Sequence, residues 1–160
     1  VKRVSHLPQI VLGAAFSFGI PMAFSATQNA LPSALWLIFL ANLLWTMAYD
    51  TLYAMVDRDD DLVVGIKSTA ILFGQADRLI VGILQAMTCA LWLLMAWQFQ
   101  RHEPAYIGII VASLGFIWQQ WRIKDRARMA CFQAFRDNIL VGLIVFVGLA
   151  VDLYLYPVAV

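Results

Sequence analysis

Residues 4–49 decide the fold class, and they read VSHLPQIVLGAAFSFGIPMAFSATQNALPSALWLIFLANLLWTMAY without one Asp, Glu, Lys or Arg. Because about 20 apolar residues cross a bilayer as a helix, a run of this length holds two crossings. Gln28, Asn29 and Pro32 are turn-forming residues near its middle, and they predict the turn between the two helices. The run indicates an integral membrane protein.

The rest of the chain is equally apolar. Hydrophobic residues make up 62% of the 160 positions and charged residues 13%, and the mean hydropathy is +0.78, which excludes an ordinary soluble domain. Further crossings are predicted over residues 79–100, 105–121 and 138–156. These runs are too long for barrel strands and lack their alternation. We therefore expect an all-α membrane bundle with about five transmembrane helices.

The basic residues predict how the bundle is oriented. If the N-terminus is cytoplasmic, every one of the eleven Lys and Arg residues except Arg101 lies on the inner side, as the positive-inside rule requires. We therefore expect a multi-pass protein of a bacterial-type inner (cytoplasmic) membrane. Residues 57–78 would face the cytoplasm, and Tyr156 would lie outside.

Residues 57–61, Asp-Arg-Asp-Asp-Asp, place four carboxylates within five positions at the end of an apolar run. On one continuous helix, Asp50, Asp57 and Asp61 would lie within about 40° of one another, whereas Asp59 and Asp60 would point elsewhere, toward solvent. Acids near a helix C-terminus cost typically about 0.3–1 kcal/mol each. The cluster therefore predicts a function, with a solvated acidic loop at the membrane boundary as the alternative.

Clustered carboxylates without a neighbouring His or Cys suit Mg²⁺, which prefers one or two carboxylates together with substrate phosphate oxygens. We predict Asp57 and Asp61 as metal ligands and catalytic residues, with Asp50 as a further catalytic acid. Ser68 would cap a short helix that covers the acids. Positive charge for the phosphate oxygens would come from basic residues on the same side of the membrane: Lys2, Arg3, Arg58 and Lys67.

Residues 49–61, YDTLYAMVDRDDD, and 65–70, GIKSTA, resemble the second aspartate-rich motif of the UbiA-type membrane prenyltransferases. Within this family they are most similar to the 4-hydroxybenzoate polyprenyltransferases of ubiquinone biosynthesis. Residues 2–9 resemble a basic segment of that group, and residues 130–135, ACFQAF, resemble its last cytoplasmic loop. The resemblance covers essentially the whole chain.

The resemblance implies a fold of nine membrane helices around a central cavity, in which two aspartate-rich motifs bind Mg²⁺ and the diphosphate of a polyprenyl donor. Asp57 and Asp61 match the paired metal-binding acids, and Arg3 matches a diphosphate-binding residue. Residues 1–160 would be the C-terminal part of this single domain. Because the first motif, Asn-Asp-x-x-Asp-x-x-x-Asp, belongs to the preceding N-terminal half of such a polypeptide, we expect these residues to be inactive without it.

The implied reaction transfers a polyprenyl group to an aromatic acid, with 4-hydroxybenzoate as the expected acceptor. Mg²⁺ would assist the departure of diphosphate, and the ring would attack the allylic carbon beside its hydroxyl group. The implied partners are the polyprenyl diphosphate, the aromatic acid and the lipid bilayer, with no nucleic acid. Close approach of helices that shape the channel is expected at four glycines: Gly13, Gly19, Gly82 and Gly108.

Two other classes of protein compete with this interpretation. The CDP-alcohol phosphotransferases also use boundary aspartates and a metal, but the Asp-Gly and Ala-Arg pairs of their signature do not precede Asp57. A transporter or a partner-dependent subunit could use Asp50 and the cluster as a cation site. Transporters place such groups near the bilayer midplane, whereas these acids are predicted at its cytoplasmic edge.

Overall fold

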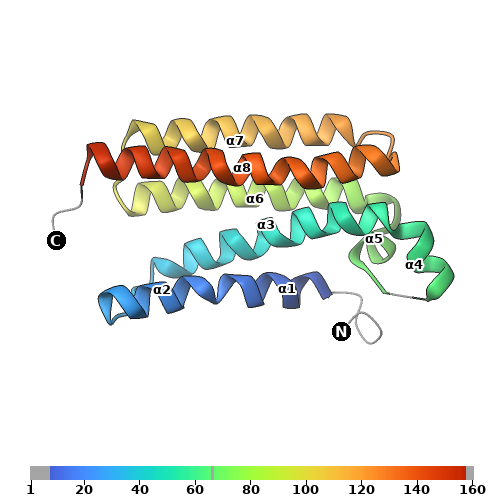
Figure 1. Ribbon diagram of the computed structural model, residues 1–160, viewed down its shortest axis with the longest axis horizontal. Helices are drawn as coiled ribbons and strands as arrows, with labels where there is room; N and C mark the ends of the chain where they lie inside the picture. Colours follow the sequence, from blue (N-terminus) through green and yellow to red (C-terminus); the bar gives the residue numbers. More distant parts are fainter. Residues whose placement is uncertain (1–7, 66, 158–160) are drawn as a thin grey trace.

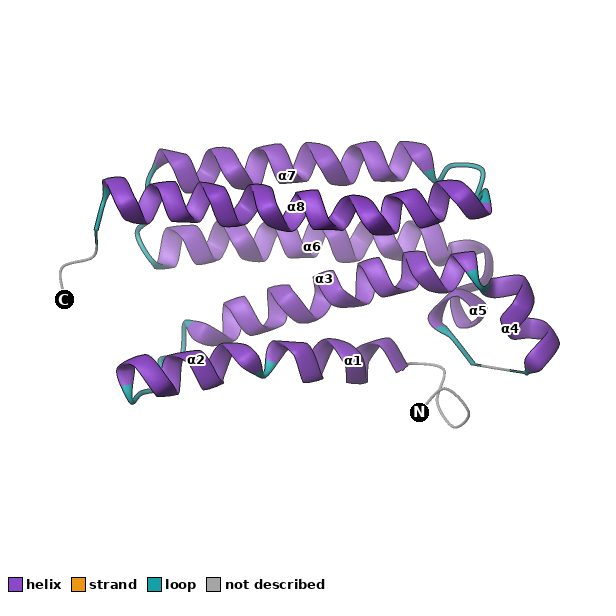
Figure 2. Cartoon of the chain, in the orientation of Figure 1, coloured by secondary structure: helices purple, strands orange, loops and turns teal. Residues whose placement is uncertain are grey.

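The computed structural model describes residues 8–65 and 67–157, and within them every element is helical (Figures 1 and 2). The prediction of an all-α protein is therefore confirmed. The elements in chain order are α1 (Pro8–Ser17), α2 (Gly19–Gln28), α3 (Leu35–Val56), α4 (Arg58–Val64), α5 (Thr69–Phe73), the 3₁₀ turn η1 (Gly74–Ala76), α6 (Asp77–Gln98), α7 (Glu103–Arg122) and α8 (Arg128–Leu155).

The long helices lie roughly along one direction (Figure 1). α8 packs along α7 and also contacts α3, α6 packs against α3 and α7, and α1 packs along α3. One part of the core lies beneath α5 and includes Leu52, Ala70 and Cys131. A second part lies farther along the bundle, around Trp92 and Phe116. The short helices α4 and α5 thus lie at one end of a packed bundle (Figure 1).

Four helical segments of the described chain are long and apolar enough to cross a membrane: Pro8–Gln28, Leu35–Val56, Thr69–Gln98 and Arg128–Leu155. They agree with four of the predicted crossings. The remaining prediction, residues 105–121, corresponds to α7, which is not among the four. Its last turns contain Gln119 and Gln120, which lower its hydropathy, although α7 packs along the full bundle beside α8 (Figure 1).

The predicted turn after the first crossing is confirmed, because α2 ends at Gln28 and Asn29 adopts the left-handed conformation with φ 49°. The start of the last helix was predicted wrongly. Residues 130–135, expected in a cytoplasmic loop, are helical, since α8 begins at Arg128 rather than near Asn138. The charged residues on either side of this stretch, Arg128, Arg136 and Asp137, interrupt the hydropathy but not the helix. Cys131 and Ala134 are buried in the core.

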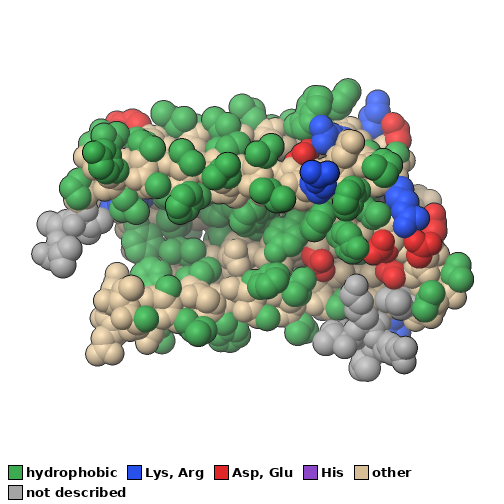
Figure 3. All heavy atoms as spheres, in the orientation of Figure 1, with side chains coloured by type: hydrophobic (Ala, Val, Ile, Leu, Met, Phe, Trp, Pro, Cys, Tyr) green, Lys and Arg blue, Asp and Glu red, His purple; other side chains and the backbone are tan. Residues whose placement is uncertain are grey.

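Most of the charged side chains in view gather at the end of the bundle that carries α4 and the loop between α7 and α8 (Figure 3). The ion pairs Arg58–Asp77, Arg126–Asp77, Arg128–Asp60 and Arg122–Asp137 form here. At the opposite end, Arg101 pairs with the buried Asp152. The acidic motif therefore shares its end of the bundle with a set of arginines.

Candidate functional site

The acidic motif forms the corner between α3 and α4 (Figure 1). α3 ends at Val56, Asp57 has φ −92° and ψ 1°, and α4 begins at Arg58. The N–H of Asp61 donates to the carbonyl of Asp57 at 2.8 Å. The prediction of one continuous helix through Asp50, Asp57 and Asp61 was therefore wrong.

The physical reason for the break lies in the charges of the motif. A continuous helix would place these carboxylates near its C-terminus, where the helix dipole opposes negative charge. The break instead places Asp59, Asp60 and Asp61 in the first turn of α4, where the dipole favours them. The corner therefore removes the unfavourable interaction between Asp59, Asp60 and Asp61 and a helix C-terminus.

Burial divides the carboxylates of the motif into two groups. Asp57 and Asp61 are half-buried, whereas Asp59 and Asp60 are exposed. Asp60 forms a surface ion pair with Arg128 at 2.8 Å. The observed exposure of Asp59 and Asp60 agrees with the expectation of solvated side chains, although the continuous helix on which that expectation was based is broken at Asp57.

The carboxylates of Asp57 and Asp61 have the properties of metal ligands. Neither makes a hydrogen bond or ion pair to another described residue, so both are available to a cation. Across residues 8–65 and 67–157, no group of three or more His, Cys, Asp and Glu residues could hold a metal by itself. A pair of oxygen donors suits Mg²⁺, which completes its coordination with water and phosphate oxygens. The residues present therefore fit part of a magnesium site.

The other predicted site residues lie in different surroundings. Asp50 is half-buried on α3, two helical turns before Asp57, and Lys67 is half-buried just before α5. Lys2 and Arg3 lie outside the described residues. The guanidinium of Arg58 donates to the carbonyls of Ala70 and, at 2.6 Å, Gly74. These described contacts of Arg58 are all to groups of the protein itself. Its contact with diphosphate stays a prediction.

The segment after the acidic motif folds as predicted. Ser68 has an extended backbone and caps α5, because its Oγ accepts the N–H of Ile71 at 3.4 Å. The hydroxyl groups of Thr51 on α3 and Thr69 on α5 share a buried hydrogen bond of 2.9 Å. These contacts hold α5 against the end of α3, next to the acidic corner.

Sequence reasoning missed Asp77, a fully buried carboxylate that pairs with Arg58 at 2.9 Å and with Arg126 at 2.8 Å. A buried carboxylate is retained only where it is paired. In the sequence, Asp77 marks only the beginning of an apolar run. Its two partners lie far away along the chain, so no local pattern could have identified the cluster.

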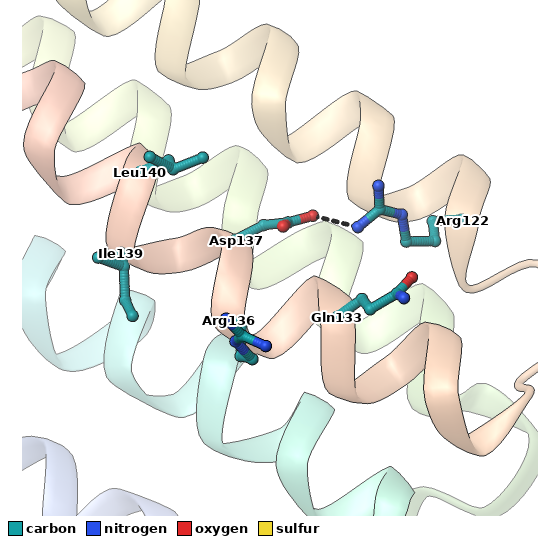
Figure 4. Close-up of a pocket in the computed structure, with 6 residues that line it drawn as sticks. All are labelled: Arg122, Gln133, Arg136, Asp137, Ile139 and Leu140. Atoms are coloured by element: carbon teal, nitrogen blue, oxygen red, sulfur yellow. Dashed lines mark hydrogen bonds and ion pairs between the residues drawn. The ribbon is translucent and has the colours of Figure 1, made fainter.

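A hollow of about 510 Å³ lies on α7 and α8, and Figure 4 shows the Arg122–Asp137 ion pair across it, with a 2.6 Å separation. Its lining residues are Arg122, Gln133, Arg136, Asp137, Ile139 and Leu140. Arg136 also borders a smaller, apolar pocket of about 200 Å³ with Trp45, Tyr49 and Phe135. The six-residue lining of the first hollow contains none of the predicted site residues.

Comparison with known proteins gives one consistent family. The sequence model described as the UbiA prenyltransferase family matches residues 1–147. The 4-hydroxybenzoate octaprenyltransferase of Sodalis glossinidius (strain morsitans) is 54% identical over 98% of this chain and 54% of its own length. That of Serratia proteamaculans (strain 568) is 57% identical over 95% of this chain and 52% of its own. The chain thus spans about half the length of the curated relatives it matches.

Two solved structures share the fold. The apo structure of a UbiA homologue from Aeropyrum pernix K1 has a TM-score of 0.79 and 24% identity, over 95% of this chain and 57% of that one. A structure from work on digeranylgeranylglyceryl phosphate synthase in membranes has a TM-score of 0.77 and 16% identity, over 90% of this chain and 51% of that one. With the family match over residues 1–147, the conclusion is that this chain belongs to the UbiA prenyltransferase family.

Proposed function

We propose that this chain supplies the second metal- and diphosphate-binding motif of an enzyme that transfers a polyprenyl group from polyprenyl diphosphate to an aromatic acid. The observation that carries the proposal is the pair of half-buried carboxylates, Asp57 and Asp61, at the corner between α3 and α4. They occur in a chain that is 54–57% identical to proteins named 4-hydroxybenzoate octaprenyltransferase. By that analogy the acceptor is 4-hydroxybenzoate.

Asp57 and Asp61 would hold the metal in this proposal. Bound there and to the diphosphate, Mg²⁺ would neutralise charge on the leaving group. The half-buried Lys67 lies between α4 and α5, where its ammonium group would bind the remaining phosphate oxygens as a point charge. Lys2 and Arg3 are proposed to add positive charge from the start of the chain.

In the proposed reaction the bond between the allylic carbon and the diphosphate oxygen breaks. A bond forms between that carbon and the ring carbon beside the hydroxyl group, and the ring carbon loses its proton. The described chain contributes by fixing the acids at the end of a bundle whose surface is largely apolar (Figure 3). Such helices suit a long isoprenoid chain and keep water from the allylic centre.

We also propose that the acidic corner faces the cytoplasm in a bacterial-type inner membrane. The support is the asymmetry of charge, because Arg58, Arg122, Arg126 and Arg128 form their ion pairs at the same end of the bundle as the acids. Arg101 pairs at the other end. The positive-inside rule assigns the arginine-rich end to the cytoplasm.

The proposal is tested with the full-length gene product, purified in detergent or reconstituted in vesicles. Incubation with a polyprenyl diphosphate, 4-hydroxybenzoate and Mg²⁺ should release diphosphate and the prenylated acid in equal amounts. Chelation of the metal should stop the reaction, and no cytidine nucleotide should be needed. Absence of the prenylated acid, together with ion flux across vesicles without any isoprenoid diphosphate, would support the transporter interpretation instead.

A further inference from the structure

Asp77, the first residue of α6, is fully buried and holds two arginines. Its Oδ1 accepts the Nε–H of Arg126 at 2.8 Å, and its Oδ2 lies 2.9 Å from Nη2 of Arg58. Oδ1 also accepts the backbone N–H of Arg78 at 2.5 Å. One carboxylate thereby joins α4, α6 and the loop between α7 and α8.

The two arginines extend this ion cluster to the segment between α5 and α6. Arg58 donates to the carbonyls of Ala70 and Gly74, and Arg126 donates to the carbonyl of Gln75. Carbonyls at the end of a short helix have no partner within the helix and need donors from elsewhere. The Asp77 cluster therefore holds the start of the acidic motif's helix α4 to the carbonyls of Ala70, Gly74 and Gln75 in α5 and η1.

The cluster acts directly on the acidic corner through Arg58. Arg58 follows Asp57 in the chain and precedes Asp61 by about one helical turn. Its backbone cannot move without moving both acids. The other ion pair of α4, between Asp60 and Arg128, has both side chains more than half exposed, and such surface pairs contribute little. Asp77 is therefore the main electrostatic restraint on the corner.

Asp77 has a second effect on the acids. The side chain of Arg58 is 25% exposed, and a guanidinium group largely removed from water is stabilised by a counter-charge. The negative groups next to Arg58 in the chain are the carboxylates of the motif itself. Because Asp77 already pairs with Arg58, Asp57 and Asp61 keep their carboxylates available. Loss of the charge on Asp77 would release Arg58 to compete with a metal ion for those oxygens.

We propose that Asp77 is the positioning residue of the metal site: by holding Arg58 it fixes the corner in the geometry in which Asp57 and Asp61 bind one divalent cation. The inference rests on the proposed function only in assigning the metal to these two acids. To the metal site it adds Asp77, which lies outside the acidic motif, and Arg126 of the α7–α8 loop, which completes the ion cluster.

The test replaces Asp77 in the full-length protein by Asn, which keeps the shape of the side chain and removes its charge. Binding of Mn²⁺, in the presence of inorganic diphosphate, is followed by the electron paramagnetic resonance signal of the free ion. Loss of a group that orients metal ligands typically lowers metal affinity or activity by about 10–100-fold. D77N should therefore raise the Mn²⁺ concentration at half-saturation about 10-fold or more.

The matched control is Asp152→Asn. Asp152 is also fully buried, pairs with Arg101 and accepts the backbone N–H of His102 at 2.6 Å, but it lies at the opposite end of the bundle. D152N should lower the melting temperature and leave the half-saturating Mn²⁺ concentration at its wild-type value. The control thereby separates general destabilisation from an effect on the metal site.

A milder variant, Arg126→Gln, covers the case in which D77N does not fold. The Arg126 side chain is 36% exposed, so its loss perturbs the interior less, and it should raise the half-saturating Mn²⁺ concentration by a smaller factor than D77N. If D77N and R126Q, or whichever of them folds, bind Mn²⁺ with wild-type affinity, the role of Asp77 is overturned and the proposed metal site is not. The same holds if D152N raises the half-saturating Mn²⁺ concentration as much as D77N does. A wild-type protein that binds no Mn²⁺ with diphosphate would overturn the proposed metal site as well.

Discussion

Thr51 of α3 and Thr69 of α5 share a hydrogen bond of 2.9 Å between two buried hydroxyl groups. The Thr51 hydroxyl also donates to the carbonyl of Met47 in its own helix at 2.6 Å. The contact between the two threonines and the Asp77 cluster, through the bond from Arg58 to the carbonyl of Ala70, both attach α5 to its neighbours. Each one therefore contributes to the position of the acidic corner.

Thr51→Val should destabilise the protein by about 1 kcal/mol, because it removes one hydroxyl and leaves that of Thr69 without its partner in a buried place. Thr51→Ser is the matched control, since it keeps the hydroxyl group and should remain closer to the wild type. The measurement is thermal unfolding of both variants in detergent. Equal stability of T51V and wild type would show that the hydroxyl pair does not hold α5.

Individual residues also show how far the sequence could predict the site. The cap at Ser68 follows from the local sequence, and the structure confirms it. The burial of Asp77 depends on Arg58 and Arg126, which meet only after the chain has folded. Contacts of that kind leave no periodic signal in the sequence.

Among the elements, one close approach of two helix backbones involves Gly148, a glycine outside the four that the sequence indicated. A Cβ built on Gly148 of α8 would lie 2.9 Å from the Cα of Gly108 and from the carbonyl oxygen of Pro104, both on α7. The prediction of close contact is thus confirmed for Gly108. It was wrong for Gly19, where nothing lies within 4 Å of a built Cβ.

Gly148→Ala should destabilise the protein, because the added methyl group meets backbone atoms that cannot rotate away. Overpacking of this kind costs about 1–3 kcal/mol, which exceeds the gain of up to about 1 kcal/mol in helix propensity. Gly19→Ala has space and should be neutral or slightly stabilising. Thermal unfolding of the two variants tests this, and a stabilised G148A would contradict the close packing of α7 and α8.

Helices were predicted well where apolar runs end at turn residues, as at Gln28, and poorly where a helix continues through charged residues. α8 continues through Arg128 and Arg136 because Cys131 and Ala134 on the same helix are buried. The break at Asp57 arises from the opposite cause, since charge repulsion and the helix dipole favour a new helix start there. Hydropathy alone registers neither effect.

At the scale of the whole molecule, the two ends of the bundle differ in charge. The acidic corner and the ion pairs of four arginines share one end, and Arg101 with Asp152 lies at the other. This asymmetry supports the proposed orientation in the membrane. The helical, multi-pass character could be predicted from the apolar runs, because such runs have few alternative structures in a bilayer. The family could be predicted only from the resemblance of residues 49–61 and 65–70 to its second aspartate-rich motif.

Single-cysteine labelling tests the orientation. In a full-length protein with its native cysteines replaced, Asp59→Cys and Glu103→Cys place exposed thiols at opposite ends of the bundle. A membrane-impermeant maleimide should label D59C only in inside-out vesicles and E103C only in right-side-out vesicles. The reverse pattern would place the acidic corner outside the cytoplasm.

The most direct test of the central claim is the rate of prenyl transfer by the full-length protein when Asp57 or Asp61 is replaced by Asn, at saturating Mg²⁺. Asp59→Asn is the matched control, because Asp59 belongs to the same turn but is exposed. We predict that D57N and D61N insert into the membrane normally and lose turnover, whereas D59N stays close to the wild-type rate. Near-wild-type turnover by D57N and D61N would contradict the assignment of the metal site.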